Sequence, residues 1–178
     1  MSEPKSVVRD RYPGYEALSQ AGHWDRATRE VVMDRVYNVP PLRFFNPQEA
    51  ETLQAVLDTV LPQDDRPPEW RVPIIHYIDE AQYKGETPGF RYEEMPEERT
   101  GWRWGLEGID QTSSIVFGRR FVELEPGERN IIMMRVQRGN APGEVWQRMP
   151  AGRFFTNTLM DAVAHAYYAH PYAWDEIG

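Results

Sequence analysis

The sequence is 178 residues long, carries a formal net charge of -8 and contains no cysteine. This length suits one domain that can bury a core without covalent staples, and the acidic balance argues against a nucleic-acid partner, whose phosphates need clustered Lys and Arg. The absence of cysteine excludes disulfides, thiolate metal sites and cysteine nucleophiles. No segment approaches the ~18 consecutive apolar residues of a membrane span. The N-terminal residues contain neither an apolar signal core nor a twin-arginine pair, so we expect a cytoplasmic protein that does not insert into a membrane. The alternative is a periplasmic protein exported as a complex through a partner's signal.

The N-terminal segment is predicted to differ from the rest of the chain. Residues 1–22 mix charges, Pro13 and Gly14 with isolated aromatic residues, which favours an extended arm that orders only by packing on something else. Tyr12 and Tyr15 are its expected anchors. Residues 23–178 are predicted to form a single, compact but irregular, mainly α domain of about five to six helices joined by long loops.

The first two helices have recognisable start signals. Asp25 is a suitable N-cap for a helix that runs to about Tyr37. Asn46, Pro47 and Glu49 together form a capping-box start for the next helix, whose apolar residues recur at helical spacing until Pro62.

Four further helices follow from apolar residues at helical spacing. The expected ranges are 72–85, 100–117, 125–139 and 152–169, with Gly85 and Gly118 at C-terminal cap positions and a break at His170-Pro171. Residues 63–70, 86–99 and 142–150 are expected to be loops. A short strand near 120–124 is the one β element that the pattern favours.

The sequence offers no constellation that points to catalysis. It contains neither G-x-G-x-x-G nor a P-loop motif, and His165 and His170 would point away from each other on a helix. We therefore predict no catalytic, cofactor-binding or metal-ligating residue in this chain. An alternative keeps a pocket formed by His170, Trp174 and Asp175 after the last helix, which would make the chain an independent small enzyme or a small-molecule binder.

Aromatic residues are unusually frequent, with six Trp, nine Tyr and seven Phe. Large rigid rings contribute much of the energy of protein interfaces, although each could equally fill the core of a small helical domain. The residues predicted to contact a partner are Tyr12, Tyr15, Trp24, Trp102, Trp104, Phe154, Tyr168, His170, Tyr172 and Trp174.

Four segments in a fixed order carry a resemblance to a known family. They are RFFNPQEAETLQAVLDTVLPQDD, VPIIHYID, GWRWGLEGIDQTSSIVFGRRFVEL and RFFTNTLMDAVAHAYYAHPYAWDEIG. Together they resemble the gluconate 2-dehydrogenase subunit 3 family, and the resemblance covers most of residues 24–178.

The resemblance implies a small helical subunit without chemistry of its own. In that family the small subunit accompanies a large FAD-dependent dehydrogenase of the glucose-methanol-choline (GMC) oxidoreductase type, often with a cytochrome c subunit. It implies that this chain holds no cofactor, that FAD is in the partner, and that the chain stabilises, loads or matures the larger subunit. The N-terminal region is more similar to cytoplasmic relatives that serve glycoside-oxidising dehydrogenases. A stand-alone assembly chaperone that leaves after flavin loading is a third possibility.

Overall fold

The computed structural model describes residues 15–86 and 89–177 and confirms the mainly helical fold. Within those ranges it contains no β-strand. The α-helices are α1 (Arg26–Tyr37), α2 (Pro47–Val60), α3 (Ile74–Lys84), α4 (Glu98–Phe117), α5 (Pro126–Gln137), α6 (Ala151–Arg153), α7 (Asp161–Tyr168) and α8 (Pro171–Ile177). The 3-10 segment η1 (Ala17–His23) precedes α1, and the 3-10 turns η2 (Pro68–Trp70), η3 (Phe121–Glu123) and η4 (Val145–Gln147) lie between later helices. A π-helical segment, η5 (Phe154–Met160), connects α6 to α7.

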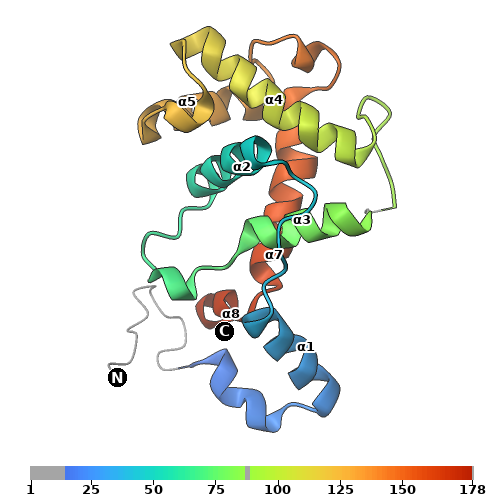
Figure 1. Ribbon diagram of the computed structural model, residues 1–178, viewed down its shortest axis with the longest axis vertical. Helices are drawn as coiled ribbons and strands as arrows, with labels where there is room; N and C mark the ends of the chain where they lie inside the picture. Colours follow the sequence, from blue (N-terminus) through green and yellow to red (C-terminus); the bar gives the residue numbers. More distant parts are fainter. Residues whose placement is uncertain (1–14, 87–88, 178) are drawn as a thin grey trace.

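The helices are arranged around a long C-terminal helical segment that runs through the molecule (Figure 1). Helices α4 and α5 lie at one end of the molecule, and α1 and α8 lie at the other. Helix α2 packs on α3, α4 and α5, while α3 packs on α7. The α3–α7 contact positions the site described below.

Residues 17–22, which we predicted as part of an extended arm, instead form the 3-10 turn η1. Ala17 is buried, and its backbone N–H donates to Oδ1 of Asp175 at 2.7 Å. This part of the chain is therefore folded onto the C-terminal helix α8, which it contacts extensively. Tyr12, the other predicted anchor of the arm, lies outside the described residues.

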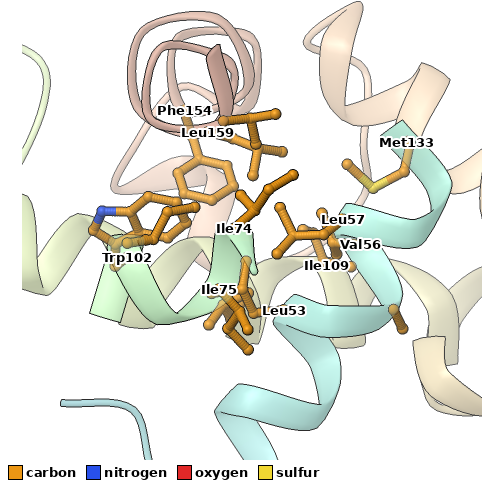
Figure 2. Close-up of a cluster of buried hydrophobic side chains, with 14 of the residues drawn as sticks. Leu53, Val56, Leu57, Ile74, Ile75, Trp102, Ile109, Met133, Phe154 and Leu159 are labelled. Atoms are coloured by element: carbon orange, nitrogen blue, oxygen red, sulfur yellow. The ribbon is translucent and has the colours of Figure 1, made fainter. Parts of the chain in front are cut away.

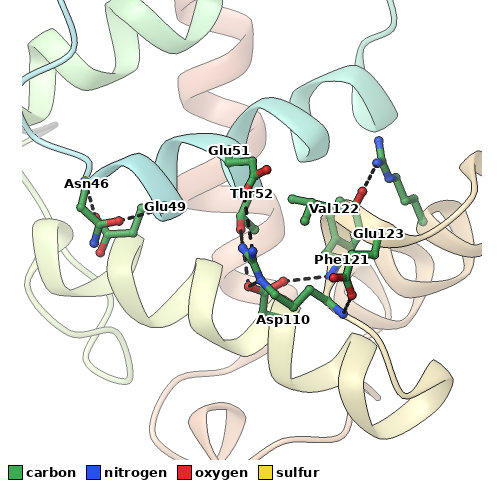
Figure 3. Close-up of polar contacts among 10 residues, drawn as sticks. Asn46, Glu49, Glu51, Thr52, Asp110, Phe121, Val122 and Glu123 are labelled. Carbon is green, nitrogen blue, oxygen red and sulfur yellow. Dashed lines mark hydrogen bonds and ion pairs between the residues drawn. The ribbon is translucent and has the colours of Figure 1, made fainter.

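Helix α2 begins as the sequence predicts. Oδ1 of Asn46 accepts the backbone N–H of Glu49, and Oε2 of Glu49 accepts the backbone N–H of Asn46, both at 2.9 Å (Figure 3). Pro47 occupies the first turn, where no N–H is needed. The capping box gives hydrogen-bond acceptors to two backbone N–H groups that have no partner within the helix, and it confirms the predicted start.

The core lies where α2, α3, α4, α5 and the C-terminal helical segment meet (Figure 2). Each element contributes the apolar side of an amphipathic helix, as expected for a helical domain. The side chains labelled there are Leu53, Val56, Leu57, Ile74, Ile75, Trp102, Ile109, Met133, Phe154 and Leu159, all of them buried.

Helix α4 approaches its neighbours closely because glycines recur along one of its sides. A Cβ at Gly105 would lie 2.1 Å from Cε2 of Phe154, and a Cβ at Gly108 would lie 2.5 Å from Cζ2 of Trp146. The two aromatic rings occupy the space that side chains would take. The helix starts two residues before its predicted position, since a side-chain oxygen of Glu97 accepts the N–H of Thr100 at 3.2 Å.

The predicted strand at 120–124 is wrong, and the segment forms the turn η3. The N–H of Phe121 donates to Oδ1 of Asp110 and the N–H of Arg120 donates to Oε2 of Glu123, each at 2.9 Å (Figure 3). These two bonds to side-chain carboxylates occupy backbone donors that a β ladder would need. Phe121 and Leu124 are both buried, so two residues three apart face the core, which is a helical spacing and not a strand spacing.

The predicted helix over 152–169 is present, but its middle is a π-helix and a further helix follows it. Segments α6, η5 and α7 run without interruption from 151 to 168, and His170-Pro171 breaks the run as predicted. Pro171 then starts α8, since its fixed φ suits a first helical position and its missing N–H is not needed there. The break is therefore a junction between two helices and not an end.

Candidate functional site

A groove between α3 and α7 has a volume of about 830 Å³. The loop 89–97 and the start of α4 close one end, and His170 lies among the residues that line it. Its floor is apolar and includes Ile78, Ala81, Met95 and Ala162. A groove of this size and lining is a typical binding site.

The π-helical segment η5 contributes to one wall of the groove. Residues 156–158 have the sequence Thr-Asn-Thr, which has low α-helix propensity, while Phe154 and Leu159 on the same segment are fully buried. Asn157 and Thr158 line the groove, and Asp161 follows them at the start of α7. π-Helical bulges occur often at functional sites, which supports a role for this wall.

Carboxylates outnumber cations along the groove. Oε1 of Glu80 is 3.3 Å from Nζ of Lys84 and 3.1 Å from the Arg43 guanidinium, so this carboxylate already has two cationic partners. Oε1 of Glu98 accepts Nε2 of Gln82 at 2.9 Å, which ties α4 to α3. The charged lining residues are Glu80, Glu86, Glu97, Glu98 and Asp161 against Arg35, Lys84 and Arg91. The groove therefore has a net negative lining.

The walls of the groove are held by hydrogen bonds and ion pairs. The Arg99 guanidinium donates to the backbone carbonyls of Gln82 and Tyr83 at 2.8 Å, which fixes α4 against the end of α3. On the opposite side, Nε of Arg153 is 3.0 Å from Oε1 of Glu94, and its guanidinium lies 4.2 Å from the ring centre of Tyr92. These contacts attach the loop 89–97 to the C-terminal helical segment, so the groove is formed before anything binds.

His170 is a buried structural residue. Its Nε2 lies 3.2 Å from the carbonyl oxygen of Arg35, and its Nδ1 accepts the backbone N–H of Tyr172 at 3.2 Å. Burial lowers the pKa of His170 from 6.5 to about 4. The imidazole is therefore neutral near pH 7, with Nε2 as the donor, and it joins α1 to the junction of α7 and α8.

The residues of the alternative pocket, His170, Trp174 and Asp175, do not converge on one site. Nε1 of Trp174 donates to the carbonyl of Tyr168 at 2.8 Å, and Oδ1 of Asp175 accepts the N–H of Ala17. His170 lines the groove, but neither Trp174 nor Asp175 does. These three side chains hold the C-terminal segment to the rest of the domain.

The predicted contact residues fall into three groups by exposure. Trp102 and Phe154 are 0% exposed and pack edge to face with ring centres 5.9 Å apart, so they are core residues that a partner on this surface cannot touch. His170 is buried in the same way. Trp24, Trp104, Tyr172 and Trp174 are partly buried, whereas Tyr15 and Tyr168 are exposed. The interface role predicted for Trp102 and Phe154 is thus corrected by their position in the core.

Several exposed apolar side chains were missed by the sequence reasoning. Tyr37 is 76% exposed and Val31 is 57% exposed, both on α1, and Phe90 at the edge of the groove is 67% exposed. The sequence held a usable signal on α1, because its apolar residues form no continuous stripe. In the structure only Val32 of its valines is buried. A helix that buries one side chain on its own domain has apolar surface left for another molecule.

In the part of the chain that the structure describes, no group of three or more His, Cys, Asp or Glu side chains is placed to hold a metal ion. None of the helices described there is both long and apolar enough to cross a lipid bilayer.

The observations above define a class: an all-helical domain whose features outside the core are an acidic-lined groove and a weakly packed N-terminal helix. The family described as gluconate 2-dehydrogenase subunit 3 matches residues 47–178, which is more than half of the chain. The chain therefore belongs to the gluconate 2-dehydrogenase subunit 3 family, a family of subunits of a dehydrogenase complex. No curated protein and no solved structure matches the chain.

Proposed function

We propose that this chain is the non-catalytic small subunit of an FAD-dependent sugar or glycoside dehydrogenase complex. In this proposal it binds a large GMC-type flavoprotein, which carries FAD and the chemistry, and it stabilises or matures that subunit. The proposal includes a cytochrome c subunit as a third member and a cytoplasmic location, with the periplasm as the alternative. Family membership supports the role of a subunit.

The observation that carries the partner-binding role is the poor packing of α1. Of its twelve residues only Val32 is buried, and its main contact is with α8. An isolated helix of about this length is marginal in water, so most of its stability must come from packing. Binding of a partner to the exposed surface of α1, which includes Val31 and Tyr37, would supply that packing.

The test is copurification from the native host with a tag on this chain. We expect a stoichiometric flavin-bearing dehydrogenase subunit to coelute, identified by its absorption spectrum and by mass. Substoichiometric recovery would favour the transient chaperone, and recovery of the chain without any flavoprotein would contradict the proposal.

A variant pair then tests α1 itself. Tyr37→Asp should weaken copurification because it places a charge in the proposed contact, whereas Ile115→Asp changes a similarly exposed side chain on α4, at the far end of the molecule (Figure 1). Equal retention of the flavoprotein by both variants would remove α1 from the interface. Point variants are preferable to deleting residues 170–178, because His170, Pro171 and Ala173 are buried and their loss would open the core.

A further inference from the structure

We propose that the groove between α3 and α7 binds a helical segment of the large dehydrogenase subunit that presents an apolar ridge flanked by Lys or Arg. This inference rests on the proposed function, which names a large subunit as the partner, and it adds where on this chain that subunit binds and what chemistry it presents.

The shape and lining of the groove fit a helix. Its floor of Ile78, Ala81, Met95, Ala162 and Ala166 is apolar and carries small side chains on α7, which let another backbone approach closely. Lys84, Glu86 and Phe90 at its edges are exposed, so the groove is an open trough along the surface. Amphipathic helices bind such troughs with apolar anchors at helical spacing.

The charges along the groove determine which side chains are favoured on either side of the apolar ridge of that segment. Glu80 is already paired with Lys84, and the side chain of Glu97 caps the start of α4. Glu86 and Asp161 are exposed carboxylates on the groove lining, contributed by opposite walls. Basic side chains on both flanks of a bound helix would therefore meet opposite charge, which favours encounter and fixes orientation.

The groove needs little rearrangement to bind. Arg99 holds the α3 side to α4, and Arg153 holds the loop 89–97 to the C-terminal helical segment. Walls that are already fixed reduce the conformational entropy lost on association.

The first experiment fills the groove and uses a matched control on the same helix. Ala162→Phe adds a ring inside the groove, while Ala164→Phe adds the same ring to an exposed position of α7 outside the lining. With the full chain tagged in the native host, we expect Ala162→Phe to weaken binding of the flavin-bearing subunit about tenfold or more and Ala164→Phe to leave it unchanged. Circular dichroism and thermal unfolding of each isolated variant show that the fold is kept.

A second experiment does not depend on tolerance of a new ring. Asp161→Lys reverses a charge on the groove lining. Glu144→Lys makes the same change at an exposed position that does not line the groove. We expect only Asp161→Lys to lower the affinity, and we expect the difference from wild type to shrink as salt is raised, because salt screens exposed charges.

The outcomes separate this inference from the proposed function. If the wild-type chain captures no flavin-bearing subunit, both are overturned. If it captures that subunit and Ala162→Phe and Asp161→Lys capture it equally well, only the groove inference is overturned. If sedimentation of the isolated wild-type chain shows a dimer that Ala162→Phe abolishes, the groove binds a second copy of this chain and the inference is wrong.

Discussion

At Gly105 the helix α4 comes so near the segment η5 that no side chain fits between them. A Cβ at this position would lie 2.1 Å from Cε2 of Phe154, whereas carbon atoms pack at about 3.5–4.0 Å. Phe154 cannot turn away easily, because it is 0% exposed and its ring centre is 5.9 Å from that of Trp102 and 6.0 Å from that of Trp146. We therefore predict that Gly105→Ala destabilises the fold.

The magnitude follows from two opposing effects. Replacing a helical glycine by alanine gains roughly 1 kcal/mol in helix propensity, while overpacking a rigid core costs about 1–3 kcal/mol and more where backbones must separate. The clash at Gly105 involves three atoms of one ring closer than 3.0 Å, so the upper part of that range applies. The expected net loss is about 2 kcal/mol, which lowers the midpoint of thermal unfolding by roughly 4–8 °C for a chain of this size.

Gly101→Ala is the matched control on the same side of α4. A Cβ there would meet Cγ of Pro96 at 3.6 Å and Sδ of Met149 at 3.9 Å, which are ordinary contacts. Only the propensity gain remains, so this variant should be more stable than wild type by about 0.5–1 kcal/mol. Urea unfolding followed by circular dichroism measures both changes. Equal stability of the two variants would refute the close-packing argument.

A double-mutant cycle identifies the ring responsible. Phe154→Leu removes the atoms that clash with the new methyl group, at the cost of a cavity beside Trp102. If Phe154 causes the loss, Gly105→Ala should cost less in the Phe154→Leu background than in wild type, by about 1 kcal/mol or more. Additive effects would place the cause elsewhere.

Three further predictions concern polar groups. Burial lowers the pKa of His170 from 6.5 to about 4, so between these pH values the unfolded state binds a proton that the native state does not. The free energy of unfolding should therefore fall by up to ~3 kcal/mol as the pH is lowered through this window. Urea unfolding at several pH values measures this fall, which should be smaller in His170→Asn. Asp79 is fully buried and accepts the backbone N–H groups of Arg43, Phe44 and Phe45, so Asp79→Ala should cost about 2–4 kcal/mol in thermal unfolding, because buried donors lose their acceptor. Asn46→Ala removes half of the capping box and should cost about 1 kcal/mol in the same assay.

The helices that could be predicted are those whose signals are local. Asn46, Pro47 and Glu49 lie within four residues and together predict the start of α2. Gly118 was predicted at the C-terminal cap of α4, and it adopts the left-handed conformation there, with φ 69°. The turn at 120–124 was missed because its decisive acceptor, Asp110, lies eleven residues earlier on α4. The composition of residues 120–124 favours a strand, and it cannot reveal that the carboxylate of Asp110 accepts the backbone N–H of Phe121.

The site was harder to predict than the fold, and the π-helical wall shows why. Whether residues 154–160 bond as an α-helix or a π-helix depends on how Phe154 and Leu159 fit the core, which is a property of the assembled domain. The aromatic residues carried the same ambiguity: Trp102 and Trp104 are two residues apart, yet the first is fully buried and the second lies partly exposed with the Arg148 guanidinium 6.0 Å from its ring centre. Composition indicates a surplus of rings but not which side of a helix they occupy.

The groove and α1 are connected through one residue, Arg35. Its backbone carbonyl accepts the hydroxyl of Tyr77 at 2.7 Å and Nε2 of His170 at 3.2 Å, and its guanidinium donates to the carbonyl of Ala169 and lines the groove. The C-terminal end of α1 is therefore fixed to α3 and to the α7–α8 junction. A partner that binds the groove and the exposed side of α1 together makes its second contact from within the same complex, so two modest contacts combine into a long-lived one. Under the proposed function, such a two-point contact would favour a permanent subunit over a chaperone that must leave.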